Sequence, residues 1–143
     1  MAAGALIHFQ GNTTVQGAIE VFVNQWPELQ AIYFFSSRAN DSMKKNSDWD
    51  FGLLPERSVD PLNLWKTKEA LEIRFSTDFD LVDLRAASTV LQFEVLKTSK
   101  LVYSSDEFAR QEYEYLVLSY YQKLSDERRD ILTDIYKRGT VYG

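Results

Sequence analysis

The sequence predicts one α+β domain, in which a small sheet carries helices and continues into a helical C-terminal extension. Apolar residues recur at helical spacing in some segments and at strand spacing in others, in the order helix, strand, loop, strand, helix, strand, helices. The 143 residues match the length of one domain, and no repeat, low-complexity tract or Gly/Ser/Pro linker divides them. We therefore expect a single domain over residues 1–143, with a core over about 14–104 and the extension over about 105–139.

The first predicted elements are a helix and a buried strand. Apolar residues in Thr14–Trp26 follow the i, i+3, i+4, i+7 pattern of a helix with one buried face, and Pro27 ends it. Leu29–Phe35 is a short apolar run rich in aromatic residues, as expected of a buried strand. Three residues could cap the start of the helix: Asn12, Thr13 and Thr14.

A polar loop and a second strand follow. Ser36–Ser47 is almost entirely polar, which predicts a loop. Asp48–Leu54 begins by alternating polar and apolar residues, which predicts a strand. Asp60 and Pro61 then form a good helix start, because proline is favoured at the first helical position. The residues expected on the buried side of this helix are Leu62, Trp65, Leu71 and Phe75.

The remaining elements are a third strand and further helices. Phe79–Leu84 is predicted to be a strand, Ala86–Lys97 a helix, and Leu101–Tyr103 a short apolar stretch. Asp106–Arg138 is long, charged and aromatic, and we expect two helices broken near Leu124–Asp126, with Gly139 as the final stop. Its aromatic residues, expected mostly in the core and in part at a partner interface, are Phe108, Tyr113, Tyr115, Tyr120, Tyr121 and Tyr136.

Composition excludes several kinds of chemistry. The chain has no cysteine and one histidine, His8, so disulfides, thiolate zinc sites, cysteine nucleophiles and histidine-rich metal sites are ruled out. The net charge of −5 argues against direct nucleic-acid binding through phosphate neutralisation. No window approaches the ~20 apolar residues of a membrane span, and the N-terminus lacks signal-peptide features, so we expect a cytoplasmic protein.

Two aspartates at the start of the second strand carry the first chemical signal. Residues i and i+2 of a strand point to one face, so Asp48 and Asp50 would present two carboxylates side by side. Such carboxylates repel each other unless a cation lies between them, and Mg²⁺ commonly takes one or two carboxylates plus substrate phosphates. The pair alone is a weak signal, because many such pairs are simply solvated.

The residues before this pair suggest an anion site. Ser36 and Ser37 follow an apolar strand and could supply hydroxyl and backbone donors to a phosphate, with Arg38 beside them. Lys44 and Lys45 are either a solvated loop tip or a second phosphate clamp. A phosphate next to a two-carboxylate metal site is the layout for metal-assisted phosphoryl or nucleotidyl transfer.

The combined segment resembles the signature of the DNA polymerase β-like nucleotidyltransferase superfamily, in which Gly-Ser is followed by a loop and Asp-x-Asp. The chain length and loop spacing are most similar to the minimal nucleotidyltransferase (MNT) antitoxins of HEPN/MNT toxin–antitoxin pairs. The string from Phe79 to Leu84 is similar to the third-strand motif, and the string from Phe93 to Tyr103 to the helix and turn after it, with Ser99 where the family usually has glycine. The resemblance covers roughly residues 14–120.

The resemblance implies roles for individual residues. Ser36, Ser37 and Arg38 would contact the nucleotide phosphates, and Asp48 and Asp50 would hold Mg²⁺. Asp80 would be the third carboxylate, which holds metal and helps to deprotonate the attacking hydroxyl. Asp83 is its rival for this role, although in a regular strand it would point to the opposite face from Asp80.

The resemblance also implies a function. We expect an antitoxin adenylyltransferase that uses ATP and Mg²⁺ to transfer AMP to a hydroxyl, favoured as tyrosine, of a cognate HEPN ribonuclease toxin in a hetero-oligomer. Ser36 stands where the family has glycine, which favours an alternative: an antitoxin that masks its toxin and has a weak or vestigial site. A third possibility, adenylylation of a small molecule, usually needs an added domain for which 143 residues leave little room.

Overall fold

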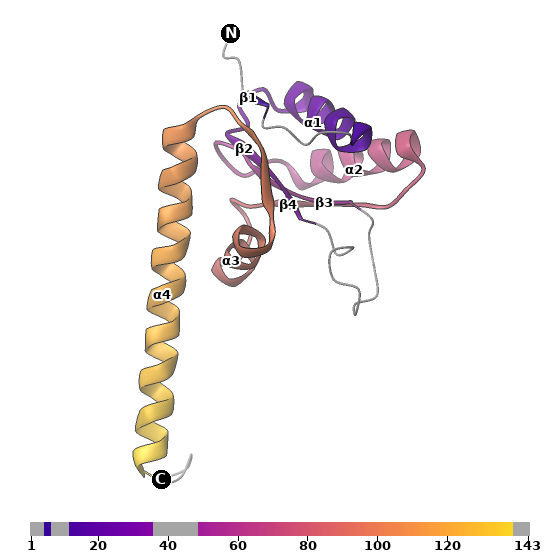
Figure 1. Ribbon diagram of the computed structural model, residues 1–143. Helices are drawn as coiled ribbons and strands as arrows, with labels where there is room; N and C mark the ends of the chain where they lie inside the picture. The colour runs from indigo at the N-terminus through magenta and orange to yellow at the C-terminus, as the bar shows by residue number, and fades with distance from the viewer. Residues whose placement is uncertain (1–4, 7–11, 36–48, 139–143) are drawn as a thin grey trace.

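The computed structural model describes residues 5–6, 12–35 and 49–138 and has the α+β architecture that the sequence predicts (Figure 1). One mixed sheet has the strand order β1-β5-β2-β3-β4. Strands β3 and β4 run parallel, and the other neighbouring pairs run antiparallel. The strands are β1 (Ala5–Leu6), β2 (Ala31–Phe35), β3 (Trp49–Leu54), β4 (Phe79–Asp83) and β5 (Lys100–Ser104). The sequence predicted β2, β3 and β4; it did not predict β1, and β5 was expected only as the short apolar stretch Leu101–Tyr103.

Each helix begins at a side chain that accepts a backbone N–H of its first turn, as expected of N-cap residues. The helices are α1 (Thr13–Gln25), α2 (Pro61–Phe75), α3 (Thr89–Thr98) and α4 (Glu107–Arg138). Asn12 caps α1 by accepting from the Val15 N–H at 3.0 Å, and Ser88 caps α3. Because Ser88 is the cap, α3 begins three residues later than predicted. The caps of α2 and α4 are Asp60 and Asp106.

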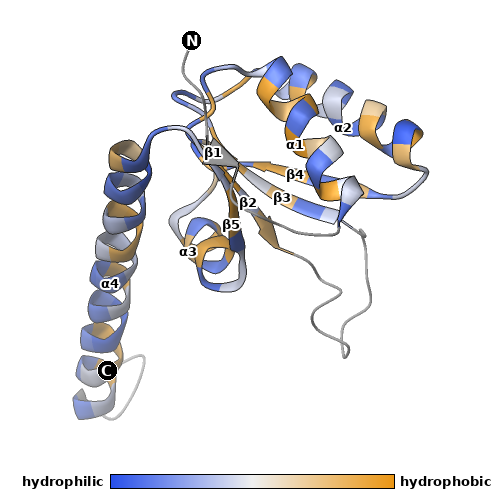
Figure 2. Cartoon of the chain, turned by 45° about the horizontal axis from the view of Figure 1, so that its top comes forward, coloured by the Kyte–Doolittle hydropathy of each residue, from blue (hydrophilic) through white to orange (hydrophobic). Residues whose placement is uncertain are grey.

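The helices cover the two faces of the sheet (Figures 1 and 2). Helices α1 and α2 pack on one face, against inward side chains that include Ile32, Phe51 and Phe79. Helix α3 and the first half of α4 pack on the other face, against Tyr33 and its neighbours. Alternation along each strand therefore decides which helical layer a side chain meets.

The C-terminal extension is one helix, so the prediction of two helices broken near Leu124–Asp126 was wrong. No glycine or proline lies within Glu107–Arg138 to break the helix. Asp126 instead supports the helix, because it accepts from the Gln122 amide at 3.0 Å and from the Arg129 guanidinium at 2.6 Å. At about 1.5 Å per residue, α4 is roughly 48 Å long. Its C-terminal half extends past α3 (Figure 1).

Two expectations about burial were also wrong. In α2, Leu71 is buried and Phe75 partly buried, but Leu62 and Trp65 are more than half exposed. In α4, most of the aromatic residues expected in the core face solvent. Tyr113 is buried and Tyr121 half-buried, whereas the exposed ones are Phe108, Tyr115, Tyr120 and Tyr136. Within the described part of the chain, no helix has the length and apolar character needed to cross a membrane.

Candidate active site at the start of β3 and β4

The parallel pairing of β3 and β4 brings two predicted site residues together. Asp50 and Asp80 are register partners, flanked by the pairs Trp49 with Phe79 and Phe51 with Leu81. Partners in parallel strands point to the same face, and neighbouring strands lie about 4.8 Å apart. The carboxylates of Asp50 and Asp80 are therefore neighbours on one face of the sheet.

That face is the one covered by α3 and α4. The neighbours of Asp50 and Asp80 along each strand, Phe51 and Leu81, belong to the core under α1 and α2, so the two carboxylates point the other way. Asp50 is only 5% exposed, while Asp80 faces solvent. The pair thus has one carboxylate fixed within the protein and one that an incoming molecule can reach.

Asp83, the rival third carboxylate, has a structural environment of a different kind. It is 9% exposed and accepts two backbone N–H groups, from Val59 and from Arg85, each at 2.9 Å. The Arg85 side chain in turn donates to the Pro55 carbonyl oxygen at 2.8 Å. Asp83 therefore fastens the segment between β3 and α2 to the end of β4, three residues away from the level of Asp50.

Four of the predicted site residues lie outside the described residues. They are Ser36, Ser37, Arg38 and Asp48, and Lys44 and Lys45 lie outside as well. The described strands on either side, β2 and β3, are joined through residues 36–48, and Phe35 is the register partner of Asp50. Residues 36–48 therefore leave β2 and enter β3 beside the Asp50–Asp80 pair.

The donor set fits a hard divalent cation. Asp50 and Asp80 are neighbouring oxygen donors, and Mg²⁺ is typically bound by one or two carboxylates with substrate phosphates and water completing its ligands. Among the residues that the structure describes, no cluster of three His, Cys, Asp or Glu side chains could hold a metal. A third protein ligand to the metal would have to come from residues that the structure does not describe, and the sequence predicts Asp48 for this role.

A hollow of about 510 Å³ lies on the same face of the sheet, between β2, β5, α3 and α4. Tyr33 lines it and pairs with Gly52, two residues along β3 from Asp50. Among its other lining residues are Phe93, Leu96, Lys97, Arg110, Glu114 and Leu118. The candidate site is therefore bordered by a partly apolar cavity, with Phe35 at the register position between Tyr33 and the loop.

A chain of polar contacts joins this cavity to α4. The Tyr33 hydroxyl donates to Glu114 Oε2 at 2.6 Å, and Arg110 bonds to both Glu114 and Glu107. Burial, with the bond to Glu114 second, raises the pKa of Tyr33 far above its ordinary value. Burial alone would lower the pKa of Arg110, but its bonds to the two glutamates raise it above the usual value. Arg110 is therefore a charged group already neutralised by two carboxylates.

This network was not predicted from the sequence. Tyr33 lies in an apolar strand run, where nothing marks it as different from its neighbours. Glu107, Arg110 and Glu114 have the i, i+3 and i, i+4 spacings of charged pairs on a helix, which is a visible signal. That spacing predicts a helical salt-bridge chain but not that Tyr33 joins it across 81 residues of sequence.

The sheet order and the paired carboxylates at the start of β3 and β4 agree with the nucleotidyltransferase resemblance found in the sequence. Residues 17–108 match the family described as polymerase beta, nucleotidyltransferase, and the chain belongs to this family. The resemblance derived from the sequence is thus confirmed at the level of the family.

Two individual relatives show more specific similarity than the family match. The chain is 32% identical over 117 residues to protein adenylyltransferase MntA of Shewanella oneidensis, a match that covers 82% of this chain and 84% of the relative. It is also similar to a structure of the tri-AMPylated Shewanella oneidensis HEPN toxin in complex with MNT antitoxin. That match has a TM-score of 0.70 and 30% identity and covers 86% of this chain and 96% of the matched one.

A second similar solved structure contains a nucleotide analogue. It is a toxin–antitoxin with AMP-PNP, and the match has a TM-score of 0.71 and 30% identity over 87% of this chain and 99% of the matched one. The similarity to MNT antitoxins of HEPN/MNT systems, expected from the sequence, is therefore confirmed.

Proposed function

We propose that this chain is an antitoxin that transfers AMP from ATP to a hydroxyl, favoured as tyrosine, of a cognate HEPN ribonuclease toxin and thereby neutralises it. The observation that carries the proposal is the register pairing of Asp50 with Asp80 on one face of a nucleotidyltransferase sheet. The relatives support it, because one is a protein adenylyltransferase and another was solved with an AMPylated HEPN toxin.

The proposed reaction is an in-line displacement at the α-phosphorus of ATP. The acceptor oxygen forms a bond to the α-phosphorus, the bond to the bridging oxygen of the β-phosphate breaks, and pyrophosphate leaves. We assign acceptance of the proton of the acceptor hydroxyl to Asp80, because its exposed carboxylate is the member of the pair that an incoming side chain can reach.

Each residue of the site has an assigned part in this proposal. Asp48, Asp50 and Asp80 would hold Mg²⁺, which when bound offsets the negative charge of the phosphates and of the leaving pyrophosphate. Ser36, Ser37 and Arg38 would bind the nucleotide phosphates. Arg110 is excluded from that task, because Glu107 and Glu114 already neutralise it.

The test is intact-protein mass spectrometry of the adjacent gene product after incubation with this protein, ATP and Mg²⁺. We expect a mass gain of one or more adenylyl groups, lost with EDTA and lost in Asp50→Asn. Glu107→Gln is a matched control, since it neutralises a carboxylate on the outer side of the Arg110 network and should preserve transfer. A wild-type protein that gives no gain while binding the toxin would refute the transferase.

That refuting result is what the second candidate function predicts. Ser36 in place of the family glycine favours a masking antitoxin, because a side chain at this position restricts how closely the backbone approaches phosphate. Ser36→Gly separates the two. A masking protein with a degenerate site would gain transfer on restoration of the glycine, whereas an active transferase already shows transfer with Ser36.

A further inference from the structure

The C-terminal half of α4 carries an apolar stripe that continues a packed surface. Val117 is buried and Tyr121 stacks on Phe93 of α3, with ring centroids 3.7 Å apart. The same side of the helix continues with Leu124, Arg128, Ile131 and Leu132, which we call the distal stripe. Leu124 is 45% exposed, Ile131 60% and Leu132 58%. The stripe thus begins as core and ends uncovered.

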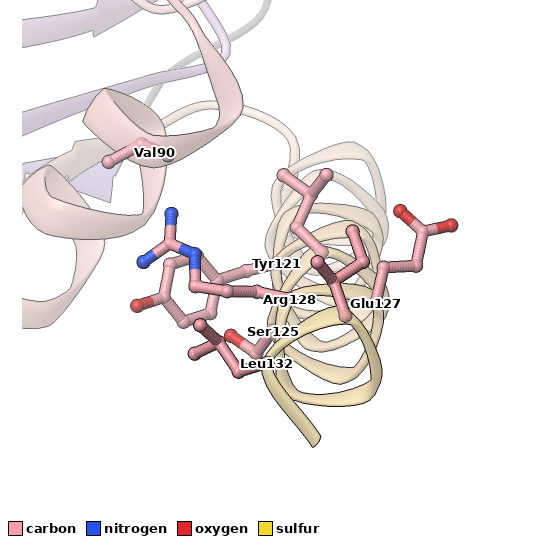
Figure 3. Close-up of a pocket in the computed structure, with 8 residues that line it drawn as sticks. Val90, Tyr121, Ser125, Glu127, Arg128 and Leu132 are labelled. Carbon is pink, nitrogen blue, oxygen red and sulfur yellow. The ribbon is translucent and has the colours of Figure 1, made fainter. Parts of the chain in front are cut away.

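The distal stripe forms one wall of a groove rather than an isolated exposed face. A hollow of about 400 Å³ lies between it and the first turn of α3, and Val90 lines the opposite side. Figure 3 shows Val90 facing Tyr121 and Arg128 across this space. A groove that is lined by apolar side chains at helical spacing is the kind of surface on which an amphipathic helix binds.

Two charged residues, Glu127 and Arg128, are among those that line the groove. The Arg128 guanidinium extends from α4 toward Val90, while the Glu127 carboxylate points away from it (Figure 3). Within the described part of the chain no ion pair is formed by Arg128, whereas the next residue, Arg129, pairs with Asp126 on the solvent side. Because the Glu127 carboxylate points away from Arg128, a partner that covers the groove is best matched by a carboxylate of its own opposite Arg128.

A second copy of this chain fits the groove poorly. Pairing two copies about a two-fold axis places the same surface on both sides, and Arg128 lies in the middle of the distal stripe. A two-fold pairing centred on Arg128 would bring the two Arg128 side chains together, and like charges at the centre of an interface disfavour that pairing.

We propose that this groove binds an amphipathic helix of the partner toxin, whose apolar face covers the distal stripe and whose acidic residue pairs with Arg128. The proposal rests on the proposed function for the identity of the partner. The groove and the Asp50–Asp80 pair lie on the same face of the sheet, the face of α3 and α4, so a toxin anchored on α4 is on the side from which its hydroxyl must approach Asp80.

The test measures the dissociation constant between the full-length chain and the purified toxin for matched variants. Leu124→Asp with Ile131→Asp should weaken binding by about tenfold or more, because it places charges in the apolar groove. Phe108→Asp with Tyr115→Asp is the control, since these side chains are 76% and 68% exposed on the outer side of the same helix. Helix content from circular dichroism, unchanged in both, shows that the helix is intact.

Charge reversal tests the pairing. Arg128→Glu should weaken binding by about tenfold or more, while Arg129→Glu, its exposed neighbour, should change it less than about threefold. Wild-type affinity in the groove variants would overturn the proposal, as would a wild-type chain that does not bind the toxin. A self-association that the groove variants abolish, with toxin binding intact, would overturn it in favour of a second copy.

The outcome is separable from that of the proposed function. Asp80→Asn should abolish AMP transfer and leave the toxin affinity at the wild-type value. A wild-type chain that binds the toxin through the groove but never transfers AMP would refute the proposed transferase activity and support the proposed docking site. AMP transfer that the groove variants leave unchanged at limiting toxin concentration would refute the docking site and support the transferase activity.

Discussion

Replacing Asp83 by alanine should destabilise the fold, whereas the same change at Asp80 should not. Asp83 is buried and accepts the Val59 and Arg85 N–H groups at 2.9 Å each. An unsatisfied buried N–H costs roughly 1–3 kcal/mol; two such bonds are lost, but Val59 is half-buried and Arg85 exposed, so water replaces part of the loss and the total should be about 2–4 kcal/mol. At about 3 °C per kcal/mol for a chain of this length, Tm should fall by roughly 6–12 °C.

Asp80 provides the matched comparison. Its side chain faces solvent, so Asp80→Ala should change the free energy of unfolding by less than about 0.5 kcal/mol. Asp83→Asn is the intermediate variant: Val59 and Arg85 donate to different carboxylate oxygens, so the single amide oxygen keeps one of the two bonds and the loss of stability should be at most that of Asp83→Ala. Urea unfolding of the three variants, followed by circular dichroism, measures these differences. An unchanged midpoint for Asp83→Ala, or an equal loss for Asp80→Ala, would refute the structural role assigned to Asp83.

Two further predictions concern packing and pH. A Cβ on Gly52 would lie 3.1 Å from Val95 Cγ1 and 3.3 Å from Leu84 Cδ1, so Gly52→Ala should cost about 1–3 kcal/mol, and a Tm equal to wild type would contradict this. Burial raises the pKa of both Tyr33 and Tyr113 above 10.0, so the unfolded chain releases their protons first and stability should fall as pH rises above about 10. The urea midpoint of unfolding should fall between pH 8 and pH 11 by less in the double variant Tyr33→Phe with Tyr113→Phe than in the wild type. An identical fall of the midpoint in both proteins would argue against the assignment.

Most of the fold was predictable because local signals and tertiary structure agree. Asn12 as a cap and the buried positions of α1 follow from side-chain chemistry and helical period alone. Strands β2, β3 and β4 were visible as apolar or alternating runs between turns. The error in α4 has a clear cause: Ser125 and Asp126 are common at helix starts, but here Asp126 bonds to Gln122 and Arg129 within a continuing helix.

The candidate site was predictable in part. Period-2 alternation correctly places Asp80 and Asp83 on opposite faces of β4. Strand pairing is not encoded locally, so the register of Asp50 with Asp80 required the sheet itself. The same holds for the bond from Tyr33 to Glu114, which depends on where α4 packs. The aromatic side chains of α4 were expected mostly in the core, but most are exposed. Helical spacing alone does not distinguish a stripe that packs in the core from one that stays exposed.

The central claim is that the Asp50–Asp80 pair directs AMP transfer from ATP to the partner toxin. The most direct test incubates the toxin and Mg²⁺ with ATP labelled at either the α- or the γ-phosphate and with wild-type, Asp80→Asn or Asp83→Asn protein. We predict label on the toxin from α-labelled ATP only, absent with Asp80→Asn and retained with Asp83→Asn. Label from γ-labelled ATP, or transfer by Asp80→Asn at the wild-type rate, would contradict the claim.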